Sequence, residues 1–351
     1  MNLDNLDRIK QLDSMDLLSH IQGLPDQLEG AYRLGLQLPL PEMQGIRQVL
    51  IAGMGGSAIG ADLLARYAAP ACPVPVVVHR DYELPAWATG PHTLVIASSH
   101  SGNTEETLSA YEIAQQRKCK TLAITTDGRL AWMADQEAQP CWTFEHNGRP
   151  SAAVGYSFGL LLAALVRLNL LPDPQQELAE ALQIMRAQQA ELEPEVPVVK
   201  NPAKRLAGQL FGRWVTVLAS GYMSPVARRW KSQISELAKA WAQFEFIPEA
   251  DHNTLAGVVN PVDILTRTMT IFLRSPSDHP RNFLRSNLTR QGFMIAGLNT
   301  DVFDARGNSP LAHIWTGLHF GDYMAFYLAM AYGIDPTQVD AVESFKTALR
   351  S

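Results

Sequence analysis

Residues 98–107 read Ser-Ser-His-Ser-Gly-Asn-Thr-Glu-Glu-Thr. They follow the apolar run 93–97, which is typical of a buried strand, and they precede residues 108–116, whose pattern predicts a helix. Free backbone N–H groups and the positive end of the helix dipole meet at such a turn, so an anion fits there. The stretch also contains the hydroxyl donors Ser99, Ser101, Thr104 and Thr107. Because no Lys or Arg lies in it, it predicts a phosphate site that works through hydrogen bonds and the helix dipole.

The same stretch is also consistent with an ordinary helix cap. Ser101 or Asn103 would be the N-cap, and Glu105 or Glu106 would complete a capping box. Four hydroxyl groups exceed what one cap needs, however, and a second glycine-rich strand–turn–helix lies upstream. We therefore favour the phosphate site.

The upstream turn, residues 53–60, reads Gly-Met-Gly-Gly-Ser-Ala-Ile-Gly and follows residues 47–52, which are predicted to form a buried strand. Its third glycine falls too late for a dinucleotide fingerprint, and no Gly-Lys-Ser/Thr follows, so it is not a Walker loop either. For Gly60 we favour close packing of the helix on the strand. The residues of this turn that we expect to contact a ligand are Gly55, Gly56 and Ser57.

Strand and helix patterns alternate along both halves of the chain. The predicted strands are 47–52, 74–78, 93–97 and 120–125 in the first half, and 213–221, part of 262–273, and 292–297 in the second. This alternation predicts an α/β fold with two doubly wound parallel sheets of the flavodoxin-like type, and ligands at the carboxyl ends of the strands. The expected division is a helical segment 1–45, a phosphate-binding domain 46–170, a linker 171–205, a second domain 206–315 and C-terminal helices 316–351.

The composition narrows the classes of function. The 351 residues are 46% hydrophobic and 18% charged, which is normal for a globular protein that can build two cores. The net charge is -6 and no basic run occurs, so nucleic acid is not an expected partner. Three cysteines form neither a disulfide framework nor a metal-ligand spacing, and no apolar run is long enough to cross a bilayer. We expect a cytoplasmic protein that needs no metal or cofactor and does not bind membranes.

Candidates for acid–base chemistry lie in the second half. Glu236, in a predicted helix over 225–242, is most simply a salt-bridge partner of Arg229 or Lys239. His252 lies in a polar loop, where a lone histidine is usually incidental. A histidine and a carboxylate in a protein with a phosphate site also make an acid–base pair, so both interpretations stay open. Arg149, in a polar loop before an apolar helix, is consistent with a plain surface charge.

Taken together, these motifs resemble the sugar isomerase (SIS) domain and, more closely, the bifunctional phosphoglucose/phosphomannose isomerase family. The resemblance covers nearly the whole chain. The matching stretches are 12–28, 53–60, 99–107, Arg149-Pro150, 229–236, 248–253 and 335–346. The Ser-Gly-Asn-Thr turn alone would indicate only an SIS domain, whereas the combination in this order is specific.

The resemblance implies the following roles. The phosphate of a hexose 6-phosphate is held by Ser57, Ser99, Ser101 and Thr104. Glu236 is the base that moves a proton between C1 and C2, Arg149 stabilises the enediolate, and His252 opens the sugar ring with help from Lys346. In the family the histidine is expected to come from the partner subunit, so the resemblance implies a homodimer with its active site at the interface.

The chain departs from the family pattern at two places. Ser235 and Leu237 flank the base where the family usually has asparagines, and His100 stands where the phosphate turn often has a tyrosine. Neither change removes a group with an implied role, but both leave the balance between glucose and mannose phosphates open. The alternatives are an isomerase of another phosphosugar, such as an amino sugar or pentose phosphate, and a non-catalytic SIS module that senses a sugar phosphate.

Overall fold

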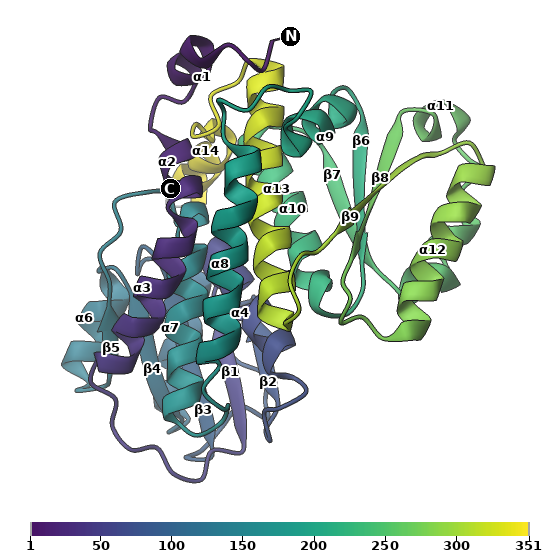
Figure 1. The fold of residues 1–351 in the computed structure, drawn as a ribbon. Coiled ribbons are helices and arrows are strands. Elements are labelled where there is room, and N and C mark those ends of the chain that lie inside the picture. Colours follow the sequence, from purple (N-terminus) through teal and green to yellow (C-terminus); the bar gives the residue numbers. More distant parts are fainter. Residues whose placement is uncertain (1, 350–351) are drawn as a thin grey trace. The chain divides into compact units, whose positions relative to one another are not determined.

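The computed structural model describes residues 2–349 (Figure 1). The chain divides into two compact units: residues 23–182, called the N-unit below, and residues 1–22 together with 183–351, called the C-unit. The predicted helical segment 1–45 and the predicted linker 171–205 are therefore each divided between the two units. Within residues 2–349 no helix has both the length and the apolar character needed to span a membrane.

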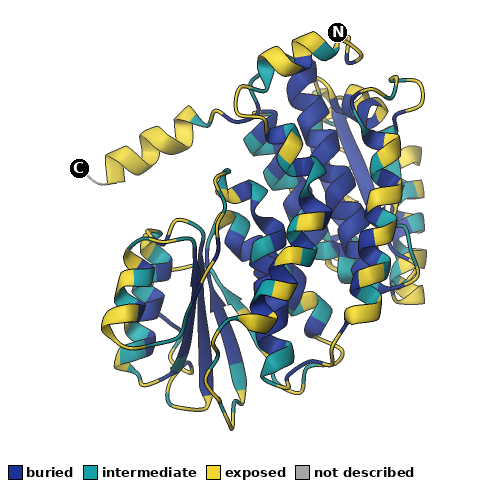
Figure 2. Ribbon diagram, turned by 60° about the vertical axis from the view of Figure 1, so that its left-hand side comes forward, coloured by how far each residue is buried: buried dark blue, intermediate teal, exposed yellow. Residues whose placement is uncertain are grey.

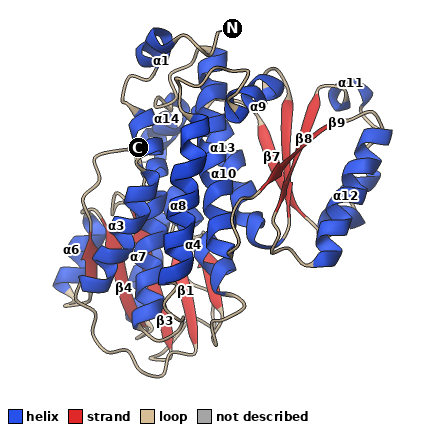
Figure 3. Ribbon diagram, viewed as in Figure 1, coloured by secondary structure: helices blue, strands red, loops and turns tan. Residues whose placement is uncertain are grey.

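The N-unit is built on a five-stranded parallel sheet, whose strands are red in Figure 3. The strand order is β2-β1-β3-β4-β5 (Figure 1). Its strands are β1 (Gln48–Ala52), β2 (Val76–His79), β3 (Thr93–Ser99), β4 (Lys120–Thr125) and β5 (Cys141–Thr143). Its helices are α3 (Leu24–Gln37), α4 (Gly55–Ala68), α5 (Glu105–Gln116), α6 (Arg129–Gln136), the 3-10 turn η1 (Pro150–Ala152) and α7 (Val154–Arg167). The predicted parallel sheet and its first four strands are confirmed, whereas the short edge strand β5 was not predicted.

The core of the N-unit follows from strand periodicity. Successive side chains of a strand point to opposite faces, so Leu50 and Ala52 of β1 share one face with Val95 of β3. They pack against Ala110 and Ala114 of α5. On the helical side, α7 packs against α3 and α4. Helix α8 (Gln175–Leu192) begins in the N-unit and ends in the C-unit.

The C-unit contains a four-stranded parallel sheet in the order β7-β6-β8-β9. Its strands are β6 (Trp214–Ala219), β7 (Ala242–Phe246), β8 (Thr268–Arg274) and β9 (Asn299–Asp304). Its helices are α1 (Leu6–Leu12), α2 (Leu17–Gln22), α9 (Pro202–Leu210), α10 (Ser224–Leu237), α11 (Val262–Leu265), α12 (Pro280–Ile295), α13 (Pro310–Tyr332) and α14 (Asp340–Leu349), with the 3-10 turns η2 (Gly221–Met223), η3 (Glu249–His252) and η4 (Thr254–Ala256). The predicted second parallel sheet is confirmed.

One predicted strand of the C-unit is wrong. Residues 292–297 are the end of α12 and the turn after it, and β9 follows only at Asn299. The apolar residues that suggested a strand lie on different faces of the helix, because Phe293 is buried whereas Ile295 is 80% exposed. The helix prediction over 225–242 is also too long: α10 ends at Leu237, and β7 begins at Ala242.

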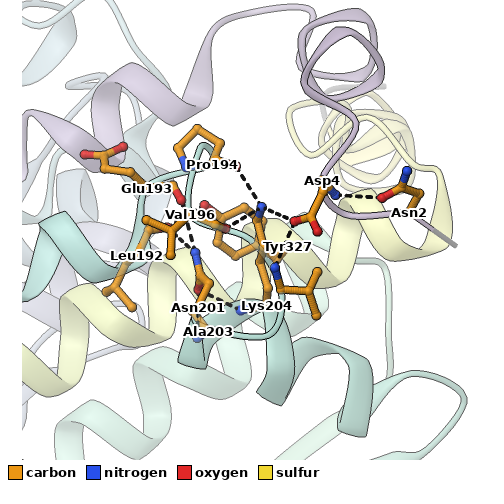
Figure 4. A network of polar contacts seen from close by, with 11 residues as sticks. Asn2, Asp4, Leu192, Glu193, Pro194, Val196, Asn201, Ala203, Lys204 and Tyr327 are labelled. Atoms are coloured by element: carbon orange, nitrogen blue, oxygen red, sulfur yellow. Dashed lines mark hydrogen bonds and ion pairs between the residues drawn. The ribbon is translucent and has the colours of Figure 1, made fainter.

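Helix α13 is buried over nearly its whole length and organises the C-unit. Arg229 of α10 donates to both carboxylate oxygens of Asp322 in α13, at 3.0 and 2.8 Å, so both buried charges are paired. The buried Lys204 of α9 is satisfied in a similar way, by Asp4 at 2.9 Å and by the carbonyl oxygens of Pro194 and Val196 (Figure 4). The Arg229–Asp322 pair is part of the core, whereas Asp4, the partner of Lys204, has 42% of its side chain exposed.

Candidate functional site

The two hydroxyl-bearing turns lie at the same edge of the N-unit sheet. Strands β1 and β3 are neighbours in parallel register, with Ala52 opposite Ala97, so α4 and α5 both start at the carboxyl edge. The backbone N–H of His100 donates to the Ser57 hydroxyl at 3.3 Å. The turns are therefore in direct contact.

Within the turn after β3, the Ser99 hydroxyl donates to the Thr104 hydroxyl at 3.1 Å. Thr104 is the N-cap of α5, and its side chain makes no capping hydrogen bond. The capping interpretation of Ser101 and Asn103 is therefore wrong. The Asn103 side chain instead accepts the Arg129 N–H at 3.1 Å, which connects the turn to the start of α6.

Two glycines of this edge are required by close packing. Gly102 has φ +65°, and a Cβ atom there would lie 1.8 Å from the carbonyl oxygen of Asp127. A Cβ on Gly56 would lie 2.5 Å from the carbonyl oxygen of Pro150. Gly60 is also explained by close packing, as predicted, because it faces Ser157. The partner is helix α7, whereas the prediction was packing of the helix on a strand. The ligand contacts predicted for Gly55 and Gly56 remain predictions.

Thr107 is a residue of α5 whose role the sequence left undecided. It lies in the first turn of α5, is 1% exposed, and its hydroxyl has no hydrogen-bond partner among residues 2–349. Leaving a buried hydroxyl unsatisfied costs about 1–3 kcal/mol. A ligand that accepts a hydrogen bond at the start of α5 would remove that cost.

Residues 144–149, called the Arg149 loop below, connect β5 to η1 and approach the same edge. Pro150, directly after the loop, packs on Gly56. Ser57, His100, Phe144 and Pro150 are among the residues that line one small cavity of about 10 Å³. Arg149 is half-buried, and among the described residues its guanidinium has no carboxylate partner. The segment that packs on Gly56 thus carries a positive charge that no carboxylate of the described residues neutralises.

The other predicted catalytic residues lie in the C-unit. Glu236 is in the last turn of α10, is half-buried, and forms no ion pair with any residue of the described range 2–349. The salt-bridge interpretation of Glu236 is therefore wrong, because Arg229 is committed to Asp322 and Lys239 donates to the carbonyl oxygen of Asp335 at 2.9 Å. Glu236 is a carboxylate without a structural role in an ion pair.

His252 is exposed at the end of η3. Its neighbour Asp251 accepts from Arg285 at 3.0 Å and from Thr289 at 2.6 Å, which fixes this turn to α12. Lys346 lies on α14, whose described residues are all exposed (Figure 2). It pairs with Glu343 at 3.1 Å. Among residues 2–349 no group of three His, Cys, Asp or Glu side chains is placed to hold a metal ion.

Two parallel α/β sheets, one with a hydroxyl-rich turn at the start of a helix, define a protein of the SIS class. In agreement, the family model for the SIS domain matches residues 42–136, and the model described as the bacterial phospho-glucose isomerase C-terminal SIS domain matches residues 199–349. The chain is also similar over its whole length to a solved glucose-6-phosphate isomerase like protein from Thermus thermophilus, with 19% identity, 99% of each chain covered and a TM-score of 0.64. That likeness concerns the fold.

Relatives of known name identify the family. The bifunctional phosphoglucose/phosphomannose isomerase of Caldicellulosiruptor bescii is 38% identical over 95% of this chain and 98% of its own length. The enzyme of the same name from Thermoplasma acidophilum is 32% identical over 95% of this chain and 97% of its own. The chain belongs to the bifunctional phosphoglucose/phosphomannose isomerase family.

Proposed function

We propose that the protein is an aldose–ketose isomerase that interconverts glucose 6-phosphate and mannose 6-phosphate with fructose 6-phosphate through a cis-enediol. The observation that carries the proposal is the presence, in one member of this family, of a hydroxyl-rich turn at the start of a helix and a half-buried carboxylate, Glu236, that no cation of the described residues neutralises. A sensor of sugar phosphates would need the first feature but not the second.

The phosphate group is assigned to the carboxyl edge of the N-unit sheet. The proposed phosphate-binding residues are Gly55, Gly56, Ser57, Ser99, Ser101 and Thr104. Backbone N–H groups at the starts of α4 and α5 add donors and the favourable end of two helix dipoles. The Thr107 hydroxyl supplies a further donor that has no other partner among residues 2–349.

Glu236 is the proposed base. It takes the proton from C2 of the open-chain aldose and returns it to C1, while the hydroxyl proton of O2 passes to O1. The carbonyl thereby moves from C1 to C2, and no net proton is consumed. The Arg149 guanidinium stabilises the negative charge that develops on the enediolate oxygens. Because C2 is planar in the enediol, one base serves both C2 epimers. His252, with Lys346, opens the sugar ring before this step.

We also propose that the protein acts as a homodimer in the cytoplasm, with His252 contributed to the partner's active site. The exposure of His252 supports this arrangement. So does an apolar stripe on α12, in which Leu284, Leu288 and Ile295 are 43%, 56% and 80% exposed. The three cysteines are free thiols, which is typical of a reducing compartment.

The test is a coupled assay with glucose 6-phosphate and mannose 6-phosphate in separate reactions, with EDTA present, on the wild type and Glu236→Gln. We expect turnover of both sugars by the wild type, no change with EDTA, and loss of both activities and of C2-proton exchange with solvent in the variant. Binding of fructose 6-phosphate survives. Glu112→Gln, an exposed carboxylate of α5, is the matched control. Full activity of Glu236→Gln would exclude it as the base, and an inactive wild type would exclude this substrate class.

A further inference from the structure

Two histidines from distant parts of the N-unit are in direct contact. His100 follows β3 in the phosphate turn, and His146 lies in the Arg149 loop, 46 residues further along the chain. Their ring nitrogens, Nε2 of His100 and Nδ1 of His146, are 2.9 Å apart. The rings stand nearly perpendicular, with centroids 5.1 Å apart. One of them therefore donates a hydrogen bond to the other.

The contact is held in a fixed aromatic setting. Phe144 at the start of the loop stacks on Tyr156 of α7, with ring centroids 4.7 Å apart, and each ring also meets a histidine of the pair. Neighbours with locked rings keep the two nitrogens facing each other. Replacing one imidazole by a planar side chain thus preserves most of the packing.

The pair joins two segments to which the proposed function gives separate tasks. On one side, the backbone N–H of His100 donates to the hydroxyl of Ser57, a proposed phosphate ligand. On the other side, His146 precedes the proposed enediolate-stabilising Arg149 by only three residues. Pro150, packed on Gly56, fixes the far end of the loop. The histidine contact adds a hydrogen bond in the middle of the loop.

The hydrogen bond between the two imidazoles survives when one ring is protonated to the cation, but not when both are. With both rings neutral, one N–H donates to the other ring's lone pair, and with one ring cationic the charged ring donates. When both are cationic, two N–H groups face each other and the hydrogen bond is lost. Burial lowers the pKa of the His100 imidazole, so both rings are cationic only in acid. The titratable groups on the segments around the pair are Glu105, Glu106, Asp127, Glu145, Arg149 and Tyr156.

We propose that the His100–His146 contact is a positioning device that holds the Arg149 loop against the phosphate turn and releases it when both imidazoles are protonated. This role rests on the proposed function, in which the loop delivers Arg149 to the enediolate. It predicts an effect on kcat rather than on KM, because Arg149 acts on charge that develops in the transition state.

Two substitutions of the same residue separate positioning from packing. In His100→Gln the amide donates or accepts by rotating, so it holds His146 in either protonation state. In His100→Phe the ring remains against Phe144, but the hydrogen bond to His146 is absent at every pH. Both variants leave every other titratable group in place. His92→Gln is the control, since His92 precedes the amino end of β3, the strand that ends next to His100.

Two readouts are needed, each at pH 5.0 and pH 7.5. The first is hydrogen exchange of the peptide that contains residues 144–153, corrected for the intrinsic pH effect. The second is kcat and KM for fructose 6-phosphate. At pH 7.5 we expect kcat of His100→Phe to lie roughly two- to tenfold below that of His100→Gln, the factor that one hydrogen bond supplies, with KM unchanged. Wild type and His92→Gln should lose loop protection and kcat in acid relative to His100→Gln.

Equal loop exchange in the Phe and Gln variants would overturn the tether itself. Different exchange with equal kcat would overturn its role in positioning Arg149. A change confined to KM would assign the pair to phosphate binding instead, which also contradicts the proposal. The exchange measurement needs no substrate, so an inactive wild type with a pH-sensitive loop would overturn the isomerase function while showing that the tether exists.

Discussion

The substitution Thr107→Val tests whether the Thr107 hydroxyl stabilises the fold or binds a ligand. Valine has nearly the same shape as threonine but replaces the hydroxyl by a methyl group. In the ligand-free protein the Thr107 hydroxyl is buried and has no partner among residues 2–349. Removing it therefore ends a desolvation cost without breaking a hydrogen bond.

We expect Thr107→Val to stabilise the free protein slightly. An unsatisfied buried hydroxyl costs about 1–3 kcal/mol, so we expect Thr107→Val to raise the free energy of unfolding of the free protein by about 1 kcal/mol. For a unit of the size of residues 23–182, this corresponds to roughly 2–4 °C in the melting temperature. Most substitutions in a core lower stability instead.

The effect on binding has the opposite sign. A hydrogen bond to a charged phosphate contributes about 1.5–3 kcal/mol, so its loss weakens binding of fructose 6-phosphate roughly 10- to 150-fold. We would measure the affinity by isothermal titration calorimetry and the stability by thermal melting with and without ligand. The variant should melt higher than the wild type alone and lower than it at a ligand concentration that saturates the wild type.

Thr121→Val is the matched control. Thr121 is as buried as Thr107, but its hydroxyl accepts from Gln115 at 3.3 Å and donates to Gln139 at 3.1 Å. This variant should be less stable by about 1 kcal/mol and should bind with unchanged affinity. If Thr107→Val behaves as Thr121→Val does, the assignment of the Thr107 hydroxyl to a ligand is refuted.

Two further predictions concern stability. His319 of α13 donates from Nε2 to the carbonyl oxygen of Ile21, and burial lowers its pKa to about 4. As the pH falls, the unfolded chain therefore protonates His319 before the folded protein does, and about 2 kcal/mol of stability should be lost between pH 7.5 and pH 5.0. Urea unfolding of His319→Gln should lack this part of the loss. A pH dependence equal to that of the wild type would contradict the prediction. Gly102→Ala should lower the free energy of unfolding by roughly 2–5 kcal/mol, because it combines a left-handed backbone with a clash with Asp127. Gly55→Ala, with φ +50° and open space around it, should lower it by about 1 kcal/mol. Equal melting temperatures of the two variants would argue against the close approach of Asp127 to Gly102.

Much of the N-unit could be predicted because its three central strands, β1, β3 and β4, are buried on both faces. All residues of β3 are buried, and β1 and β4 are buried apart from their first residue, which produces continuous apolar runs with sharp ends. The turns after β1 and β3 could be located from the same pattern. Their contact through Ser57 followed from the parallel arrangement, which places the carboxyl ends of neighbouring strands together.

The C-unit was harder to predict because its edge strands lack such runs. Strand β9 has the sequence Asn-Thr-Asp-Val-Phe-Asp, in which only Phe303 is buried. The end of α12 is locally more apolar than this strand, so a search for apolar runs chooses the helix. Strand β7 follows α10 so closely that the helix pattern obscured it. In both places the deciding contacts come from the neighbouring strand and are absent from the local sequence.

The local sequence is also insufficient to predict the detailed shape of the candidate phosphate site. Its residue types could be predicted from the hydroxyl-rich stretch, but the shape of the turn is set from outside it. Asp127 approaches Gly102, Arg129 donates to Asn103, and His146 bonds to His100, so segments from β4–α6 and β5–η1 fix the turn from two sides. A Ser-Gly-Asn-Thr motif therefore specifies which groups can bind a phosphate, whereas the segments packed around it decide where those groups point. The His100–His146 contact is the one of these constraints that a change of proton concentration can remove.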